Sequence, residues 1–404
     1  MTRTSPGATP RTLAVIGDMP HHRDEHGTLH GLEPVVAQLD CWADLFDELV
    51  LGGPLLPGPP PAGFAPYRSP NVRLHELPRG GGNTLRAKLG MIPLVPVWAW
   101  RTRQLARSVD AVHLRSPCNI AMVATLSTWK AVRYRYALYA GVWRGYEGEP
   151  RFFRYQRELL GSNWFDGPVS VYAGPDPRHP HLEPFFSPSY DLATWERSTD
   201  VADAARQRVR DMPDAGPWRA IVVGRLTPNK NHKAAIEALR LLVAQGVDIS
   251  MDLAGDGPER EHLTKQVAAA GLTDRVRFHG MVDYGEVMRL FGESDVQILS
   301  TYQEGFGKVL LEGMVQGVVP VLSHSPVADE IAGHGSRGVV VDPDDAAAMA
   351  AAVQALIADR ERWEAMVNDA RAFTRELTLE SFAVRVRQLL ERQWGVTFEE
   401  PADP

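Results

Sequence analysis

The chain has 404 residues, of which 44% are hydrophobic and 23% charged, the composition of a globular protein large enough for two domains. Its net charge of -7 offers nucleic acid no attraction, so we expect no nucleic-acid partner. Two cysteines, Cys41 and Cys118, are too few for a disulfide framework and fit a reducing cytoplasm. The most apolar window, residues 91–100, is about half the length that spans a bilayer, and the N-terminus lacks the apolar run of a signal peptide. We therefore expect a cytoplasmic protein.

The first half of the chain alternates short apolar runs with helical patterns. Strands are expected at residues 11–17, 46–52, 71–77, 110–116, 134–141 and 168–174, the last being the final strand of this half. Helices are expected at residues 119–132, 151–161 and, in part, 83–109, where Pro93 and Pro96 force a break. A polar loop follows the first strand. Strands that alternate with helices predict a mainly parallel, doubly wound sheet.

The second half has the same organisation after a Pro- and His-rich connector at residues 175–192. Strands are expected at residues 218–226, 248–254, 275–280, 296–300, 318–323 and 338–341. Helices are expected at residues 231–246, 259–271, 284–294, 307–317 and 346–357, with a helical tail that runs to about residue 394. Two Rossmann-like halves in series are therefore predicted.

The segment EGFGKVLLE, residues 304–312, follows one of these strands and begins a helix. A helix N-terminus presents unpaired backbone N–H groups and a positive dipole end, which together suit a phosphate. Glu304 precedes the helix and Glu312 lies inside it, about 10 Å further along the axis. The two carboxylates could therefore bind hydroxyl groups on either side of a pyrophosphate; the alternative is a glycine-rich turn with two solvated glutamates.

The segment VVGRLTPNK places Arg225 and Lys230 in the loop after the first strand of the second half. Two cations beside a helix start suit a diphosphate leaving group, whose developing negative charge must be stabilised. Each could instead be a surface charge. Their common position at the carboxyl end of a strand, in the same half as Glu304, favours a functional role.

Together these segments resemble the donor-binding domain of the retaining glycosyltransferases of family 4, over residues 218–345. The matching elements are GRLTPNK, LAGDGPERE, FHGMV and EGFGKVLLEGMVQGVVPV, in that order. The resemblance implies an α/β protein of the GT-B fold, with two Rossmann-like, doubly wound domains facing a central cleft. Residues 1–190 would form the acceptor-binding domain and residues 191–379 the nucleotide-sugar donor-binding domain.

The tail of the chain, residues 377–394, carries apolar side chains along much of one helical face. They are Leu379, Phe382, Val384, Val386, Leu389 and Leu390. In the resembling family the end of the chain crosses back onto the first domain. We therefore expect a helix at about residues 380–404 to pack there; the alternative is a helix on the surface of the second domain.

The resemblance also implies roles for residues that match the family's motifs. Arg225 and Lys230 would bind the donor diphosphate, Glu304 the hydroxyls of the donor sugar, and Glu312 the nucleotide ribose. The first turn of the following helix would offer backbone amides, and the end of the FHGMV strand would contact the base. The residues at the helix start are Gly305, Phe306, Gly307, Lys308 and Val309. The residues that would contact the base are His279 and Met281. One departure from the family pattern is that Pro326 and Val327 stand where the family often has a glycine pair.

The first half contributes further candidates around its first strand. Gly17 begins a loop that, in the resembling family, faces the donor phosphates. His22, His26 and His30 have i, i+4, i+8 spacing, which could bind a metal on a helix; Gly27 and the charged neighbours favour a loop instead, with His22 and His26 on the acceptor side. We therefore expect no metal.

The strand at residues 110–116 resembles the one after which the family places a histidine near the reacting carbon. His113 is the catalytic candidate there and Arg115, on the same strand face, is an acceptor-side candidate. A structural role for His113 is the alternative. Residues 134–165, which include the acceptor-side candidate Trp143, mix aromatic side chains with arginines. They could form an acceptor surface, a peripheral contact with the inner face of an anionic membrane, or core aromatics beside solvated arginines.

The resemblance implies a retaining glycosyltransferase that moves a sugar from a nucleotide donor, with UDP preferred, to a hydroxyl of a glycan, lipid-linked or small natural-product acceptor. It implies front-face transfer without metal or cofactor, in which the leaving phosphate helps to deprotonate the incoming hydroxyl. Two alternatives stay open. A sugar-nucleotide epimerase of the same fold would change the donor without any acceptor, and a non-catalytic binding protein would not turn the donor over.

Overall fold

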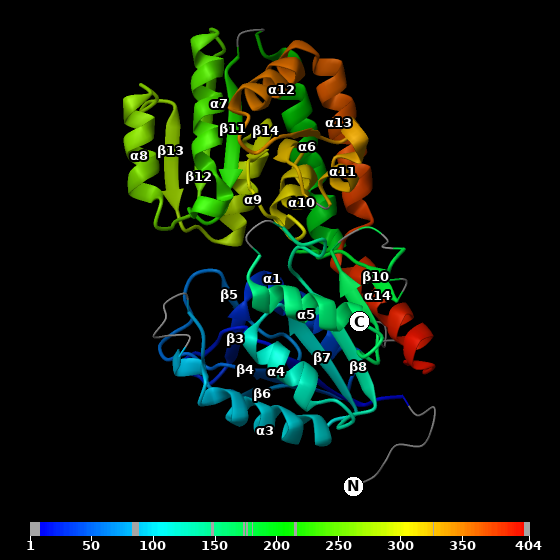
Figure 1. Ribbon diagram of the computed structural model, residues 1–404. Coiled ribbons are helices and arrows are strands. Elements are labelled where there is room, and N and C mark those ends of the chain that lie inside the picture. Colours follow the sequence, from blue (N-terminus) through cyan, green and yellow to red (C-terminus); the bar gives the residue numbers. More distant parts are fainter. Residues whose placement is uncertain are drawn as a thin grey trace. The chain divides into compact units, whose positions relative to one another are not determined.

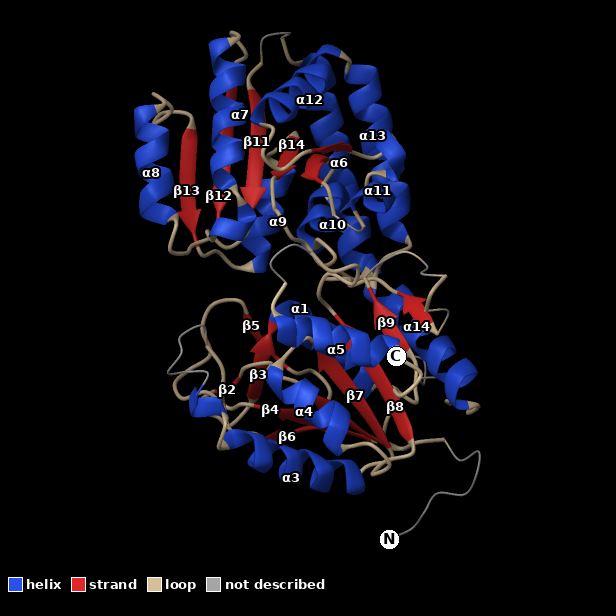
Figure 2. Cartoon of the chain, in the orientation of Figure 1, coloured by secondary structure: helices blue, strands red, loops and turns tan. Residues whose placement is uncertain are grey.

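The computed structural model describes residues 9–82, 89–146, 149–172, 174, 177–179, 181–213, 216–325 and 327–399. The chain divides into two compact units (Figure 1). The N-terminal unit combines Met1–Ser187 with Leu379–Pro404, and the C-terminal unit is Pro188–Thr378. The sequence predicted these boundaries one to three residues later, after residues 190 and 379. Within each unit a parallel sheet lies between layers of helices (Figure 2).

The sheet of the N-terminal unit has the strand order β10-β9-β8-β7-β1-β4-β6, and every neighbouring pair is parallel. The strands are β1 (Thr12–Ile16), β4 (Glu48–Gly53), β6 (Val72–Glu76), β7 (Ala111–Ser116), β8 (Tyr134–Tyr139), β9 (Val169–Val171) and β10 (Leu182–Pro184). The strand order reverses between β1 and β7, so the connections that follow these two strands run toward opposite edges of the sheet. A crevice therefore opens between them at the carboxyl ends of the strands.

Two features of this unit differ from the prediction. The strand expected at residues 168–174 is not the last of this half, because β10 pairs with it as a seventh strand. The connector expected at residues 175–192 therefore contains a strand of the sheet. The expected polar loop after β1 instead forms a small antiparallel sheet, because Leu29 is buried and gives the loop an apolar anchor. Its strands are β2 (His21–Arg23), β3 (Leu29–Leu32) and β5 (Phe64–Pro66).

Helices cover both faces of the N-terminal sheet. They are α1 (Glu33–Ala43), α3 (Leu94–Arg107), α4 (Asn119–Ser127), α5 (Arg151–Gly161) and α14 (Leu379–Trp394). Side chains of α3, α4 and α5 share a core with one set of alternate strand residues, including Val112 and Ala137. The ring of Trp42 on α1 packs against the opposite set, represented by His113 and Tyr136, so α1 covers the other face.

The last helix packs within the N-terminal unit, beside α1. Its buried residues are Phe382, Val386, Leu389 and Leu390, whereas Val384, expected on the same face, is 54% exposed. The ring of Phe382 contacts Phe185 with centroids 5.4 Å apart, and Trp394 stacks near Tyr134 at 5.1 Å. These apolar contacts explain why a segment so late in the chain belongs to the first unit.

The sheet of the C-terminal unit has the order β13-β12-β11-β14-β15-β16, again with parallel neighbours. The strands are β11 (Trp218–Val223), β12 (Ile249–Ala254), β13 (Val276–Gly280), β14 (Val296–Leu299), β15 (Val319–Ser323) and β16 (Val339–Val341). This is the six-strand order of a Rossmann fold, with its reversal between β11 and β14.

The helices of the C-terminal unit follow the expected alternation. They are α6 (Leu192–Asp211), α7 (His232–Ala244), α8 (Arg260–Ala269), α9 (Tyr284–Gly292), α10 (Lys308–Val315), α11 (Ala328–Ile331), α12 (Ala346–Ala358) and α13 (Arg360–Arg375), with short 3-10 turns at η1 (Pro228–Lys230) and η2 (Gly333–Gly335). Sequence analysis did not predict α6. Among the described residues, no helix has the length and apolar character needed to cross a membrane.

Candidate functional site

Two loops of the C-terminal unit leave the sheet at its switch point, because β11 and β14 are hydrogen-bonded neighbours. The first loop, residues 224–231, runs from β11 through η1 into α7. The second, residues 300–307, runs from β14 into α10. In open α/β sheets, ligands bind in the crevice that such a pair of loops borders.

Hydrogen bonds join the two loops directly. The backbone N–H of Tyr302 donates to the carbonyl of Asn229 at 2.9 Å, and the Thr301 hydroxyl donates to the same carbonyl at 3.0 Å. The Ser300 hydroxyl donates to the carbonyl of Asn231 at 2.9 Å. Asn231 has a left-handed backbone, with φ of 48°, which turns the chain into α7. The loops are therefore one braced unit.

The braced loops bring two of the predicted site residues together. Lys230 Nζ lies 2.6 Å from Glu304 Oε2, with the two side chains only 22% and 18% exposed. Arg225, five residues earlier, is exposed and makes no ion pair within the described part of the chain. A cation held by a carboxylate thus lies beside a second cation that is open to solvent, an arrangement suited to a polyanionic ligand.

The second loop ends in the N-terminus of α10. Gly307 caps this helix with φ of 77°, and a Cβ at that position would lie 3.0 Å from Leu310 Cδ1, so a larger residue would be strained. Phe306 is buried, which holds the loop against the unit, while Gly305, Lys308 and Val309 are partly exposed. The start of α10 therefore presents its backbone at the crevice.

Glu312 lies one turn into α10, about 6 Å along the axis from its first residue. Its side chain is buried, with the residue 8% exposed, and Oε1 accepts a hydrogen bond from the Ser189 hydroxyl at 2.6 Å. Ser189 lies in the segment that sequence analysis treated as a connector. No local pattern identifies it, because its partner is more than a hundred residues away along the chain.

The ends of β12 and β13 form the next part of the same sheet edge. His279 Nε2 lies 2.6 Å from Asp252 Oδ1, a contact that sequence analysis did not predict. Gly255 approaches the first loop so closely that a Cβ would lie 2.0 Å from the carbonyl oxygen of Gly224. Met281, which follows β13, is 62% exposed. His279 is therefore oriented by a carboxylate, and Met281 offers an apolar surface next to it.

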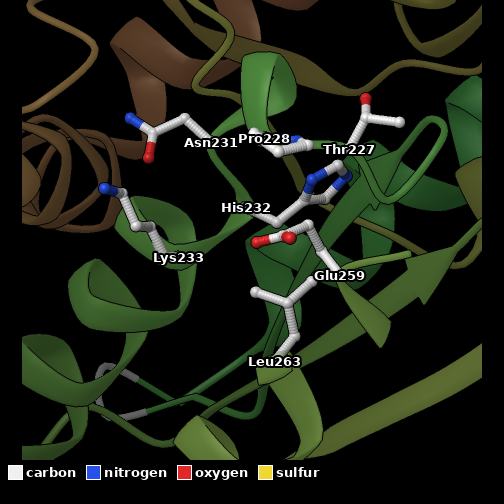
Figure 3. A pocket seen from close by; sticks show the side chains of 7 residues that line it. All are labelled: Thr227, Pro228, Asn231, His232, Lys233, Glu259 and Leu263. Carbon is white, nitrogen blue, oxygen red and sulfur yellow. The ribbon is translucent and has the colours of Figure 1, made fainter. Parts of the chain in front are cut away.

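A small pocket lies behind the first loop, between the starts of α7 and α8 (Figure 3). It is lined by Thr227, Pro228, Asn231, His232, Lys233, Glu259 and Leu263. His232 is 3% exposed, and burial, with a smaller effect of the Lys230 charge, lowers its pKa to about 4. The imidazole beside Lys230 is therefore neutral at pH 7 and adds no charge to the loop.

Residues 204–373, which contain both loops, α10 and the small pocket, match the family of glycosyl transferases group 1. This segment therefore resembles a glycosyltransferase domain. The chain is 32% identical over 147 residues to glycogen synthase of Mycobacterium tuberculosis strain H37Rv, covering 36% of each protein. It is 32% identical over 151 residues to alpha-D-kanosaminyltransferase of Streptomyces kanamyceticus, covering 37% of this chain and 39% of that protein. The chain thus matches just over a third of the length of these curated relatives.

Solved structures resemble the chain over almost its whole length. Anabaena HepE in complex with UDP-glucose aligns with a TM-score of 0.67 at 18% identity, covering 94% of this chain and 99% of that one. Sucrose-phosphate synthase from Thermosynechococcus elongatus aligns with a TM-score of 0.66 at 19% identity, covering 95% and 98%. The likeness establishes the fold: the N-terminal and C-terminal units are the two Rossmann-like units of the GT-B fold.

The N-terminal unit has the corresponding switch point between β1 and β7. Gly17 ends β1, and a Cβ there would lie 3.3 Å from the Cβ of Arg115 on β7. These two candidates are therefore neighbours, as their positions at adjacent strand ends require. They lie in a different unit from Lys230 and Glu304.

His113 lies in the core of the N-terminal unit, 1% exposed, rather than at an open strand end. Its ring is 4.5 Å from that of Trp42 and 4.6 Å from that of Tyr136, between centroids. Burial holds its pKa well below the ordinary value, and neither ring nitrogen has a hydrogen-bond partner among the described residues. This placement supports the structural alternative and leaves no face for a substrate.

The three histidines after β1 lie on a β-hairpin and its turn, so the helical spacing that suggested a metal site does not occur. His22 on β2 is buried, with Nδ1 3.1 Å from the carbonyl of Gly58, and His30 on β3 has Nε2 3.1 Å from Asp24 Oδ2. His26 lies exposed in the turn. In the part of the chain that the structure describes, no three His, Cys, Asp or Glu side chains are grouped as metal ligands.

Five aromatic side chains of the stretch at residues 134–165 are buried in the core: Tyr134, Tyr136, Tyr139, Trp143 and Phe165. Trp143 is 4% exposed and packs edge-on against Tyr139, so this acceptor-side candidate has little free surface. Phe152 and Tyr155 on α5 are exposed. Pro326 and Val327 stand where the resembling family often has a glycine pair. Pro326 lies outside the described residues, and Val327 is buried.

Proposed function

We propose that this chain is a glycosyltransferase that moves a sugar from a nucleotide donor to an acceptor hydroxyl, with retention of the anomeric configuration. The observation that carries the proposal is the braced loop pair at the C-terminal switch point, where Lys230, Glu304 and the start of α10 meet. UDP-sugar is the proposed donor, because HepE, a neighbour in fold, is a complex with UDP-glucose.

Each polar group of the loop pair has a proposed role. Arg225 and Lys230 bind the two phosphates, and the first amides of α10 add backbone donors to the same site. Glu304 accepts hydrogen bonds from hydroxyls of the sugar while remaining paired with Lys230. Glu312 accepts hydrogen bonds from the ribose, with the Ser189 hydroxyl fixing one of its oxygens.

The proposed reaction breaks the bond between the sugar C1 and the phosphate oxygen and forms one between C1 and the acceptor oxygen. The acceptor proton passes to the departing phosphate oxygen on the same face of the sugar. Negative charge develops on the diphosphate as C1 departs, and the cations of Arg225 and Lys230 stabilise it. The protein supplies placement and charge, so no protein nucleophile is required.

A panel of nucleotide sugars tests this proposal. Thermal shift should identify the donor that stabilises the protein, since a ligand that binds only the folded state raises the unfolding temperature. Slow hydrolysis of that donor, followed by transfer to added hydroxyl acceptors and NMR assignment of the product anomer, would establish activity and retention. A donor that binds without being hydrolysed or transferred would contradict an enzymatic role. Epimerised donor in the absence of acceptor would identify an epimerase.

The loop cations also replace the metal that many sugar-nucleotide enzymes use for the diphosphate, so we propose that transfer is metal-independent. Transfer should persist in excess EDTA at an unchanged rate. Loss of transfer in EDTA with recovery on adding manganese would contradict this assignment.

A further inference from the structure

Residues 89–107, which run into and through α3, expose large apolar side chains at the surface of the N-terminal unit. Leu89, Ile92, Val95 and Trp100 are 57%, 64%, 44% and 62% exposed. No other twelve-residue stretch within the described residues exposes as many large apolar side chains. Contiguous exposed apolar groups of this kind mark a surface that contacts something other than water.

The exposed face is distinct from the face that holds α3 in place. Trp98, Thr102 and Leu105 point into the core, and Trp98 Nε1 donates to the carbonyl of Pro78 at 2.8 Å. On the outer side, four residues follow one another at intervals of four, three and four along the sequence, the spacing of one helical face. They are Pro96, Trp100, Arg103 and Arg107. The face is therefore apolar at the start of the helix and basic at its end.

The end of α4 extends the same surface, because the two helices pack together. The Arg103 guanidinium donates to the carbonyl of Ser127 at 2.9 Å. Just beyond that residue, Trp129 is 39% exposed, and the exposed Lys130 holds its Nζ 4.4 Å from the centre of the Trp129 ring. Apolar and cationic groups therefore alternate on this surface too. We call the exposed side of residues 89–107, which include α3, together with the end of α4 the α3/α4 face.

The charge of this region is opposite to that of the whole protein. Residues 77–146 contain eleven arginines and lysines and a single acidic residue, Asp110, in a chain of net charge -7. The Asp110 carboxylate accepts hydrogen bonds from the backbone and hydroxyl of Thr12, which orients it toward β1. Glu76, at the end of β6, is the exposed carboxylate that borders the segment on its other side.

We propose that the α3/α4 face docks on an anionic lipid bilayer. Tryptophan side chains are favoured at the boundary between headgroups and acyl chains, and arginine and lysine bind lipid phosphates beside them. A second copy of this chain is a poor occupant, because it would bring the same positive charge to the interface. Nucleic acid would bind the cations but would leave the apolar side chains of Ile92 and Trp100 exposed to water. The docking is independent of the proposed transfer reaction.

Vesicle flotation of the full chain tests the proposal without any sugar donor. The protein should float with vesicles of phosphatidylcholine and phosphatidylglycerol in a two-to-one mixture and remain behind with phosphatidylcholine alone. Binding should weaken at high salt, because ions screen the charges. Absence of flotation with the mixed vesicles at low salt, or equal flotation with both kinds, would overturn the proposal.

Variants of exposed residues separate the two contributions. Ile92→Ser with Trp100→Ser should reduce binding by roughly 10-fold or more, since two apolar side chains no longer enter the interface. Arg107→Gln with Lys130→Gln should reduce it by roughly 10-fold or more, at about 5-fold for each cation near the surface. The controls are Val384→Ser, exposed on α14, and Arg151→Gln, exposed on α5. Controls that lose binding equally, or α3/α4-face variants that keep it, would assign the contact to another surface.

Discussion

In the C-terminal unit the strand order reverses between β11 and β14, and in the N-terminal unit it reverses between β1 and β7 in the same way. At the first position two polar loops meet, and Lys230 pairs with Glu304 in partly exposed surroundings. At the second, Gly17 approaches Arg115, while His113 two residues earlier is enclosed by aromatic rings. One unit has polar groups positioned at its switch point, and the other has a packed core immediately beneath it.

The difference shows what a Rossmann-like topology decides and what it leaves to the side chains. The strand order opens a crevice in both units. Chemistry depends on which residues the adjoining loops carry and on whether water and ligand reach them. Lys230 lies past the strand end and is reachable, whereas His113 lies inside the strand with its side chain under α1.

The strongest test of this comparison is removal of the cations at the C-terminal switch point. Lys230→Ala and Arg225→Ala should each slow transfer by about 10²–10³-fold, the usual scale for loss of one preorganised charge stabiliser. Steady-state kinetics with the donor identified above would measure it. Lys265→Ala, at an exposed lysine paired with Glu261 on α8, is the matched control and should leave the rate unchanged. Full activity of both site variants would remove the phosphate-binding assignment.

The two glutamates of the same site should separate binding of the nucleotide from binding of the sugar. Glu312→Ala should weaken UDP by roughly 10- to 100-fold, because hydrogen bonds to a charged group contribute about 1.5–3 kcal/mol. Glu304→Ala should leave UDP affinity nearly unchanged and lower affinity or rate for the intact donor. Calorimetric titration with UDP and with the UDP-sugar distinguishes them. Equal losses for both ligands in both variants would contradict the separate roles.

The smallest expected effect on catalysis comes from the N-terminal switch point. His113→Phe should change the transfer rate by less than about 3-fold, because a ring between Trp42 and Tyr136 performs no proton transfer. Its effect should appear in stability against pH instead. Burial holds the pKa of His113 well below 6.5 in the folded state, so below that pH the unfolded state binds an extra proton and folding weakens.

The pH dependence gives this prediction a measurable slope. Below pH 6.5 the unfolding free energy of the wild type should fall as the pH falls. In His113→Phe this slope should be smaller by up to about 1.4 kcal/mol per pH unit, because the unfolded variant no longer binds the extra proton. Part of the decline should remain, because burial also lowers the pKa of His21 and of His232 to about 4. Chemical denaturation of wild type and variant across this range measures the difference. A large fall in transfer rate with an unchanged slope would restore a catalytic role for His113.

The sequence predicted the C-terminal unit well, because its elements carry strong local signals. The helix expected at residues 231–246 and the strand expected at residues 296–300 appear as α7 and β14 with small differences at their ends. The loop motifs predicted Lys230 at the carboxyl end of a strand in the same half as Glu304, and in the structure the two side chains are in contact. Their ion pair followed from the topology rather than from any local pattern.

The errors have physical causes that a single sequence does not display. Ser189 and Asp252 acquire their partners only when distant segments come together, so neither could be assigned beforehand. The family resemblance made His113 a catalytic candidate, with a structural role as the alternative, and the sequence does not reveal that a tryptophan from α1 covers its ring. The strand β10 was missed because it lies among the prolines and histidines of residues 175–192, which are typical of a connector.

The brace between the two loops of the C-terminal unit bears on the entropy of ligand binding. The carbonyl of Asn229 accepts from both the amide and the hydroxyl of neighbouring residues in the other loop, so the backbone there is ordered by folding itself. A ligand that bridges the loops would lose little further chain entropy on binding. The amide of Tyr302 should accordingly exchange slowly with solvent even without ligand, although it belongs to a surface loop.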